Sequence, residues 1–475
     1  MQNQSLFNYR KITPATIERL RSLVGEGNVV TGQFDLENYS RDEMPAKMQF
    51  VPEAAVKAET AQQIAEILKL AGQENFPVTP RGRGTGLSGG CLPVCGGIVL
   101  SLEKMEKVLE LDRRNLMAVV EPGIINAELQ RTVEEEGLFY PPDPASLESC
   151  SIGGNLAENS GGPRAVKYGV TRNFVCGLEA VLANGEIIHY GGKMVKNVAG
   201  YDLAHLLIGS EGTFAVITQA ILKLLPLPFY KIDLLIPFIS LTQAAEMVSR
   251  IIGEKRIIPT AVEFMEKDAI KACEIYLKRE LPFSDFPAQL LIELDGEDLP
   301  ELQKQMEKIG ELALQMGAPD ILVADNPAQQ RRLWEARRSL LDTMKSISSE
   351  MEIADISVPR WMIPEMVKRI KQKSEKAGIC SICFGHAGDG NLHIHFLKRE
   401  LDDQTWQAKS RPLLVEVIRD VLELGGSVSG EHGIGITKKP YLKMAMSESE
   451  LKLMRTLKQT LDPRMILNPG KVLDF

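Results

Sequence analysis

The sequence predicts a two-domain α+β protein, and three observations lead to that class. At 475 residues, the chain is longer than one compact hydrophobic core usually serves. A hydrophobic share of 44% and a charged share of 25% are those of an ordinary globular protein. Helical and strand-like patterns alternate without an internal repeat, and the proline-containing segment 223–230 separates a glycine-rich first half from a second half with longer helices.

The elements expected in the first half flank two glycine-rich segments. Residues 60–76 predict an amphipathic helix, with Thr60 and Gln63 as a capping box and apolar residues at helical spacing after them. Residues 82–97 hold seven glycines in sixteen positions, a content that excludes a regular helix or strand. The other expected features are a strand at 117–121, a short helix from Asn126 to Gly137, a glycine-rich segment at 153–169, and strands at 212–218 and 289–294.

Charge, hydropathy and cysteine content exclude several classes of function. A net charge of -8 without a basic run disfavours binding to nucleic acid or to anionic membranes. No stretch approaches 18 uninterrupted apolar residues, so no integral membrane segment is expected, and the N-terminus lacks a secretory signal pattern. Seven scattered cysteines fit free thiols in a reducing cytoplasm better than a disulfide framework. We therefore expect a cytoplasmic protein, in which any attachment to a membrane goes through a partner.

The first glycine-rich segment predicts a diphosphate-binding loop. It contains the pattern G-x-G-x-x-G from Gly84 to Gly89, which is the fingerprint of a Rossmann dinucleotide site when a helix follows at once. Here Gly90, Pro93 and two further glycines follow, so no helix can begin and the Rossmann interpretation fails. Glycines still allow successive backbone N–H groups to converge on an anion, and Ser and Thr hydroxyls add donors.

Further motifs extend this interpretation to a resemblance. They are P-D-P-A-S at 142–146, S-I-G-G-N-L-A-E-N-S-G-G at 151–162, K-N-V-A-G-Y-D at 196–202, G-S-E-G-T at 209–213 and the tail L-D-P-R-M-I-L-N-P-G-K at 461–471. With the first loop, they resemble the vanillyl-alcohol oxidase and p-cresol methylhydroxylase (PCMH) flavoproteins. Within that superfamily, the chain is similar to the flavoprotein subunit of glycolate oxidase and to FAD-dependent D-lactate and D-2-hydroxyglutarate dehydrogenases.

The resemblance implies a PCMH-type FAD-binding domain at 1–228, an α/β substrate (cap) domain with a metal site at 229–430, and a C-terminal segment at 431–475 that returns to the FAD domain. It also implies a set of FAD contacts, with Ile217 as the weakest of them. Because no His lies in the glycine-rich loop, we predict non-covalent FAD, with Cys150 as the first suspect if a covalent bond exists. The implied contacts are Arg81, Gly82, Gly84, Thr85, Gly86 and Ser88 for the diphosphate, Asp143, Ser146, Gly153, Gly154, Asn159 and Gly162 for the isoalloxazine and ribityl groups, and Ile217 for the adenine.

A histidine cluster in the second half predicts a metal site. Four of the six histidines lie between positions 386 and 432. The turn-forming G-D-G-N sequence lies between His386 and His393 and lets their side chains converge, while Glu431 adds a carboxylate on a glycine-hinged segment. Two imidazoles and one carboxylate suit Zn²⁺ or Mn²⁺ with open coordination positions. Hydrogen-bonded core or loop histidines are the alternative, and the C-x-x-C at 380–383 is read as buried thiols.

The family resemblance gives this cluster roles. His386, His393 and Glu431 match the metal-ligand positions of the D-2-hydroxyglutarate dehydrogenase type, and His432 matches its catalytic base. His395 stands where relatives often carry another polar residue, and it either contacts substrate or completes the metal shell.

The substrate carboxylate needs a fixed cation, and an arginine supplies a bidentate fork for it. The segment L-W-E-A-R-R resembles the family's W-x-x-R pattern and makes Arg337 the candidate, against the alternative of an exposed helical arginine. D-2-hydroxyglutarate enzymes carry an additional Lys before D-x-S-x-P. Here Ile353 and Ala354 precede Asp355, so we expect a short monocarboxylate.

These features predict FAD-dependent oxidation of a small D-2-hydroxy acid, with D-lactate or glycolate favoured, to the 2-oxo acid with help from a divalent metal. Nothing in the sequence supplies an iron–sulfur cluster, so electrons would pass to a partner such as an iron–sulfur subunit or an electron-transfer flavoprotein. Two alternatives are a non-catalytic FAD electron-transfer subunit, which the intact His–Glu set disfavours, and a flavin-free metallohydrolase, which the glycine segments disfavour.

Overall fold

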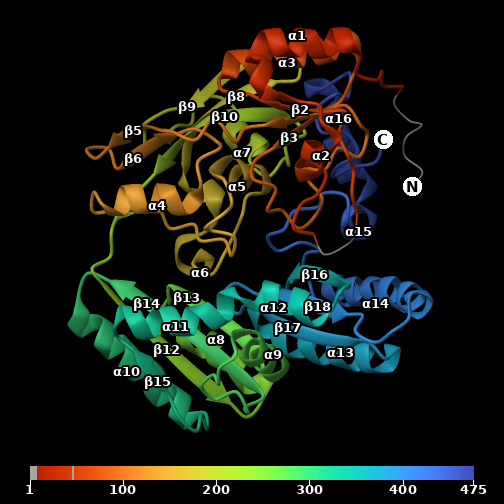
Figure 1. Ribbon diagram of the computed structural model, residues 1–475. Coiled ribbons are helices and arrows are strands. Elements are labelled where there is room, and N and C mark those ends of the chain that lie inside the picture. Colours follow the sequence, from red (N-terminus) through yellow and green to blue (C-terminus); the bar gives the residue numbers. More distant parts are fainter. Residues whose placement is uncertain (1–7, 45–47) are drawn as a thin grey trace.

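The computed structural model describes residues 8–44 and 48–475, which form two lobes (Figure 1). The first lobe contains two main sheets, with strand orders β1-β2-β4-β3 and β5-β6-β10-β8-β9. Its strands are β1 (Val29–Val30), β2 (Ala54–Lys57), β3 (Val78–Arg81), β4 (Ile98–Ser101), β5 (Val108–Asp112), β6 (Met117–Val120), β8 (Val175–Leu182), β9 (Ile187–Gly191) and β10 (Ala215–Lys223), with β7 (Leu138–Phe139) paired to β11 (Leu225–Pro226). Its α-helices are α1 (Pro14–Val24), α2 (Gln33–Leu36), α3 (Ala61–Glu74), α4 (Asn126–Glu134), α5 (Ile152–Glu158), α6 (Ala165–Tyr168), α7 (Leu203–Leu207), α15 (Lys439–Ala445) and α16 (Glu448–Leu461). Its 3-10 helices are η1 (Glu26–Asn28), η2 (Glu37–Tyr39) and η3 (Thr171–Phe174).

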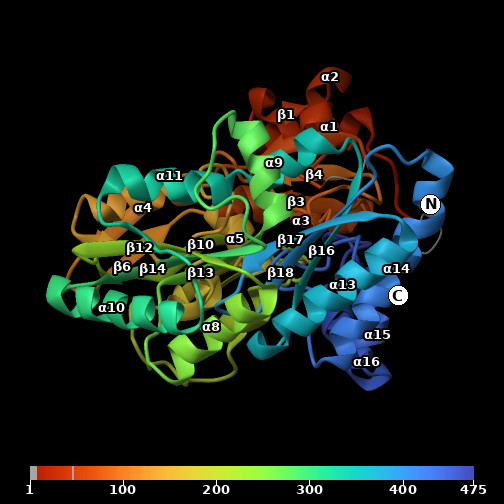
Figure 2. The same ribbon diagram turned by 90° about the horizontal axis from the view of Figure 1, so that it is seen from below.

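The second lobe is one seven-stranded sheet of order β15-β12-β14-β13-β17-β18-β16 with helices on both faces (Figures 1 and 2). Its strands are β12 (Tyr230–Phe238), β13 (Ala261–Glu266), β14 (Ala288–Gly296), β15 (Leu322–Ala324), β16 (Met351–Ser357), β17 (Cys380–His386) and β18 (Asn391–Leu397). Its helices are α8 (Leu241–Gly253), α9 (Lys267–Leu277), α10 (Leu299–Gln315), α11 (Pro327–Arg338), α12 (Leu340–Ile347), α13 (Ile363–Ala377) and α14 (Asp403–Glu423), with the 3-10 helix η4 (Arg360–Met362).

Alternation along the strands divides the second lobe into two cores. Leu234 and Ile236 of β12 pack with α8, α10, α13 and α14, whereas Leu235 between them packs with α9, α11 and α12. Successive side chains of a strand point to opposite faces, so one strand supplies both cores. By the same alternation, Ile382, Phe384 and His386 of β17 share the face that carries α9, α11 and α12. The histidines therefore lie on the face of the sheet that α9, α11 and α12 cover.

Most expected elements are confirmed, with small shifts at their ends. The helix expected at 60–76 is α3, which Thr60 caps by accepting the Gln63 backbone N–H at 3.2 Å. It ends two residues early because Asn75 adopts a left-handed conformation. The reciprocal half of the predicted capping box is shifted, since the Gln63 side chain accepts the N–H of Glu59 rather than that of Thr60. The strands expected at 117–121, 212–218 and 289–294 correspond to β6, β10 and β14, and the helix expected from Asn126 is α4, which ends at Glu134.

The first glycine segment joins β3 to β4 without an intervening helix, as the rejection of a Rossmann site requires. The second glycine-rich segment, at 153–169, contains most of α5 and all of α6. After α14 the chain returns to the first lobe, where Val78 of β3 donates to the Ile466 carbonyl and accepts from Asn468, at 2.7 and 2.8 Å. Among the described residues, no helix is both long and apolar enough to cross a membrane.

Candidate functional site

A cleft of about 430 Å³ is lined by both glycine segments, by β10 and by residues of the second lobe. The lining also includes Glu431 and His432, so the cleft extends from the glycine loops to the histidine cluster. Arg338 and Lys345, at the end of α11 and in α12, contribute another wall. The predicted FAD contacts on the lining are Arg81, Gly82, Gly84, Thr85, Gly86, Ser146, Gly153, Gly154 and Ile217.

Gly84 shows why the first segment needs glycine. Its φ is +74°, a conformation that side chains disfavour, and a Cβ there would collide with the guanidinium of Arg81. That guanidinium is fixed in turn by the Asn38 carbonyl at 3.2 Å and the Cys91 thiol at 3.1 Å. The loop therefore holds a buried cation beside backbone N–H groups, an arrangement suited to an anionic diphosphate.

Four predicted FAD contacts are not among the residues that line the cleft, although chain neighbours of several of them are. Ser88 is fully buried, and its carbonyl accepts the Ile436 N–H at 2.8 Å. Asp143 pairs with Arg338 at 3.3 Å and with Arg164 at 3.5 Å. Gly162 packs against the Asp143 backbone, and the Asn159 side chain accepts the Arg172 N–H at 2.9 Å. In this structure these residues support the loops that form the lining.

The sheet brings the predicted metal ligands together. His386 ends β17 opposite Asn391 of β18, and His393 of β18 lies opposite Phe384, so the two histidines are diagonal neighbours across the strand pair. The Nε2 atoms of His386 and His393 are 3.4 Å apart, and Glu431 Oε1 lies 3.5 Å from the first and 3.4 Å from the second. Both imidazoles are buried and Glu431 is half-buried. Three potential ligand atoms thus converge on one point.

The spacing of these atoms fits a tetrahedral metal. Three ligand atoms at about 2.1 Å from zinc, with tetrahedral angles, lie about 3.4 Å from one another. The three separations found here, 3.4, 3.5 and 3.4 Å, match that pattern. His386 also has the partner that metal-bound imidazoles usually have, because its Nδ1 is 2.7 Å from Glu263 Oε1.

Glu263 is a functional residue that the sequence interpretation missed. It lies on β13 directly opposite His386, is fully buried, and also contacts Arg337 Nε at 2.5 Å. Burial would raise the pKa of Glu263, but Arg337 and His386 lower it, so the carboxylate is ionised. The available sequence signal was a glutamate within the otherwise apolar start of β13.

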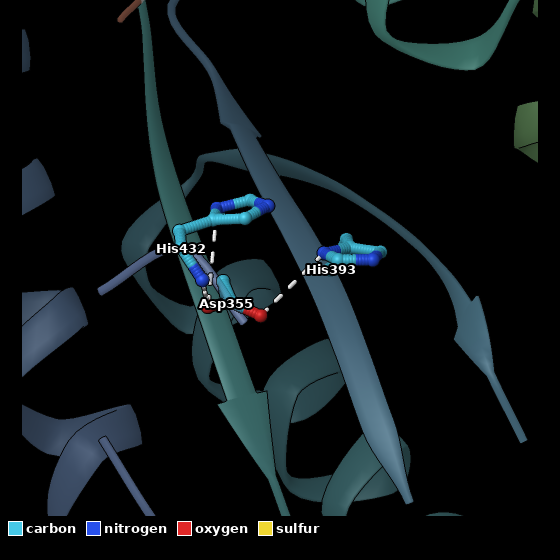
Figure 3. A group of neighbouring side chains, drawn as sticks. All are labelled: Asp355, His393 and His432. Atoms are coloured by element: carbon cyan, nitrogen blue, oxygen red, sulfur yellow. Dashed lines mark hydrogen bonds and ion pairs between the residues drawn. The ribbon is translucent and has the colours of Figure 1, made fainter. Parts of the chain in front are cut away.

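Asp355 is the second missed residue, and Figure 3 shows it between His393 and His432. It lies on β16 opposite His393, with an Oδ1–Nδ1 distance of 3.7 Å, and its Oδ2 is 3.9 Å from His432 Nδ1. Its Oδ2 also accepts the backbone N–H groups of Gly430, Glu431 and His432 at 2.9–3.1 Å. Lys438 donates to the same atom at 2.8 Å. One carboxylate therefore orients the segment that carries Glu431 and His432.

The surroundings set the protonation states of the cluster. Burial lowers the pKa of His393 and of His432, so both imidazoles are neutral at neutral pH and can accept a proton or bind a cation. Burial would likewise lower the pKa of His386, but the carboxylates of Glu263 and Glu431 raise it well above its usual value. Glu431 is the reverse case: burial would raise its pKa, whereas His386 and the other histidines lower it to about 2.

The remaining candidates lie beside the cluster. Arg337 is buried between Glu263 and the Phe384 ring, 5.3 Å from the ring centre, and its Nη2 has no hydrogen-bond partner among the described residues. It does not line the cleft, whereas Arg338 does. His395 stacks on Phe384, and burial lowers its pKa to about 3. In the C-x-x-C, Cys383 is buried and Cys380 half-buried, and both are free thiols.

Comparison with known proteins agrees with these observations. Residues 52–191 match the FAD binding domain family, and residues 228–472 match the family of FAD linked oxidases, C-terminal domain. The chain is 42% identical over 461 residues to the glycolate oxidase subunit GlcD of Bacillus subtilis, with 97% of each chain covered. It is 36% identical over 473 residues to D-lactate dehydrogenase of Anaerostipes hadrus, with 98% of this chain and 99% of that protein covered.

Solved structures show the same fold. p-Cresol methylhydroxylase superimposes with a TM-score of 0.79 at 17% identity and covers 98% of each chain. 4-Ethylphenol oxidase from Gulosibacter chungangensis gives 0.76 at 19% identity, with 96% of each chain covered. The fold and the glycine-lined cleft thus define an FAD-binding oxidoreductase with the predicted PCMH-type α+β fold. The chain belongs to the family of FAD-linked oxidases.

Proposed function

We propose that this FAD-linked oxidoreductase converts a small D-2-hydroxy acid, with D-lactate or glycolate favoured, to its 2-oxo acid with the help of a divalent metal. The observation that carries the proposal is the position of Glu431 and His432, which line the cleft of the glycine loops while Glu431 completes the group formed with His386 and His393. The relatives named as a glycolate oxidase subunit and as D-lactate dehydrogenase support this substrate class.

His386, His393 and Glu431 would hold the metal, Zn²⁺ or Mn²⁺, and the glycine-lined cleft would hold FAD without a covalent bond. When bound, FAD supplies a hydride acceptor and the metal supplies a Lewis acid. Two nitrogen ligands and one carboxylate leave positions open for a substrate hydroxyl.

His432 would act as the general base. His432 lines the cleft, and its lowered pKa keeps its imidazole neutral. Asp355 lies near Nδ1, at 3.9 Å, and thereby favours the tautomer with the proton on Nδ1. Nε2 is then free to take the hydroxyl proton of the substrate. The second hydrogen of the oxidation leaves C2 as hydride, so a hydroxy acid becomes an oxo acid.

Arg337 would bind the substrate carboxylate. Its Nε is occupied by Glu263, but Nη2 has no partner within the described residues and remains able to donate.

Electrons would leave through a partner, an iron–sulfur subunit or an electron-transfer flavoprotein. A GlcD relative is named as a subunit, which supports an assembly of this kind. A cytoplasmic location stays a prediction, as does the division of the chain at residues 228 and 430.

The test is anaerobic bleaching of the bound flavin by D-lactate, L-lactate, glycolate and D-2-hydroxyglutarate in turn, with and without a chelator. Chelator-sensitive bleaching by a short acid, selective for the D form where the acid is chiral, supports the proposal. His432→Ala should abolish bleaching while FAD stays bound, and His393→Ala should also remove the bound metal. Absence of bleaching by every acid would contradict it and favour a non-catalytic electron-transfer subunit.

A further inference from the structure

Two carboxylates meet in the wall of the FAD cleft, away from the predicted metal ligands. Glu158, the last residue of α5, and Glu211, in the turn before β10, both line the cleft. They face each other beside Gly433, where a Cβ would collide with Glu158 Oε2 and lie 3.0 Å from Glu211 Oε1. A Cβ on Gly90 would likewise lie 3.0 Å from Glu158 and 3.7 Å from Glu211. The pair thus lies between the first glycine segment and the segment that carries His432.

The two side chains are held differently. The Glu211 carboxylate accepts the backbone N–H groups of Ile434 and Gly435, both at 2.7 Å. Lys438 and Lys471 add positive charge near Glu211. Glu158 is half-buried, and its Oε2 is enclosed but has no hydrogen-bond partner in the described part of the chain. Two backbone donors and two lysines therefore stabilise a negative charge on Glu211, whereas Glu158 has only the charge of Lys438 to support ionisation.

Charge repulsion then decides where a proton resides. Two ionised carboxylates at close range in a poorly solvated wall repel each other, so one of them retains a proton. Burial, Glu211 and Asp42 all raise the pKa of Glu158, and only Lys438 opposes them. Burial also raises the pKa of Glu211, but its two backbone donors and the lysines oppose the shift. The proton is thus expected on Glu158.

We infer that Glu158 keeps its proton and donates a hydrogen bond from its carboxyl group to an acceptor atom of bound FAD, while Glu211 remains ionised beside it. The cleft must accept an anionic diphosphate, and an ionised Glu158 next to Gly86 and Gly90 would repel it. A protonated carboxyl group removes that repulsion and adds a donor to the backbone N–H groups of the loop. Glu158 is thus a cofactor-binding residue in addition to the glycine positions.

Infrared spectroscopy of the FAD-loaded protein tests the proton directly. The wild-type protein should show C=O stretching bands of protonated carboxylic acids, and Glu158→Gln should lose one component while the component of Asp233 remains. Glu148→Gln is the matched control, because Glu148 is an exposed carboxylate that pairs with Arg131 at 3.0 Å. Its spectrum should keep the component that Glu158→Gln loses. Identical carboxylic-acid bands in the wild-type protein and in Glu158→Gln would overturn the inference.

The pH dependence of FAD retention tests the hydrogen bond. Bound FAD raises the affinity of Glu158 for its proton, so by linkage the wild-type protein should lose FAD more readily, on dilution, as the pH rises. Glu158→Gln, a neutral donor of the same shape, should match the wild type at low pH and show no such dependence. Glu158→Ala should weaken FAD binding about tenfold, the effect of one lost hydrogen bond. Tighter FAD binding by Glu158→Gln at neutral pH would mean that Glu158 is ionised and would overturn the inference.

Discussion

Asp355 Oδ2 accepts the backbone N–H of His432 at 2.9 Å and lies 3.9 Å from the Nδ1 atom of the same residue. One carboxylate on β16 therefore fixes both the backbone and the ring environment of the proposed base. Because Oδ2 also accepts the Glu431 N–H at 3.0 Å, the position of a proposed metal ligand depends on the same atom. The glycine-hinged segment 429–435 is held in place by a residue of the sheet.

Asp355→Asn should destabilise the protein by about 3–5 kcal/mol, because it leaves buried Lys438 without its anion and brings an amide N–H toward backbone donors. Urea unfolding would measure the change. Burial would raise the pKa of Asp355, but His432, Lys438 and His393 lower it well below the usual range. The stabilisation is therefore present above the pKa of an unfolded aspartate and is lost as the pH falls through the depressed folded-state pKa.

A matched control is Asp285→Asn, which removes a largely exposed carboxylate that pairs with Lys271. It should change stability by less than about 0.5 kcal/mol. Equal effects of the two substitutions would show that Asp355 does not organise the segment.

Glu263→Gln should lower metal affinity about 10- to 100-fold, since Glu263 orients the His386 ring through Nδ1. Titration of Zn²⁺ into metal-free protein would measure it. Glu266→Gln is the control, because Glu266 is a buried carboxylate on the same strand that pairs with Lys371 and the Cys383 N–H instead. If both variants lose metal affinity equally, the effect is one of general destabilisation and Glu263 has no specific part.

Two adjacent arginines can be distinguished by kinetics. Arg337→Lys keeps a positive charge beside Glu263 but removes the planar fork, so it should raise the KM for the hydroxy acid at least about tenfold. Arg338→Lys, on the cleft wall beside Asp143, should raise it less than about threefold. The opposite order would assign the substrate carboxylate to Arg338.

Asp233→Asn should stabilise the protein increasingly as the pH rises. Burial and Glu293, its register partner on β14, raise the pKa of Asp233 to about 8. A folded state that binds more protons than the unfolded one loses stability with rising pH, and this loss occurs between about pH 4 and the raised pKa. Urea unfolding at pH 5 and pH 8 should show a gain of about 1–3 kcal/mol at pH 8 and little difference at pH 5. A gain in stability that does not depend on pH would exclude the raised pKa of Asp233 as its cause.

Acid precipitation should release all the flavin into solution, because FAD is predicted to be non-covalent. If flavin stays with the protein, Cys91 rather than Cys150 becomes the first residue to replace. Cys91 lines the cleft, whereas Cys150 is buried and is not a lining residue. Cys91→Ala would then free the flavin and Cys150→Ala would not.

The sequence predicted more of the residues that form the site than of the residues that hold them in place. Residue types at fixed spacing identified the glycine loops and the group formed by His386, His393 and Glu431, because ligand chemistry restricts which residues can serve. It did not find Glu263, Asp355 or Glu158, whose roles come from neighbours distant in the chain. It also predicted FAD contacts at Ser88, Asp143, Asn159 and Gly162, which are not among the residues that line the cleft, and these four contacts stay predictions.

The sequence by itself determined the fold class, the glycine-rich character of the cofactor loops and the clustering of histidines near residue 390. The loop composition and the histidine clustering are local, since glycine content and periodicity act within a few residues of chain, and the fold class follows from several such segments in order. Only the tertiary structure decided that Glu263 lies opposite His386 and Asp355 opposite His393. Strand register across β13, β17, β18 and β16 sets those pairs, and register depends on packing of the whole sheet, which no short segment encodes.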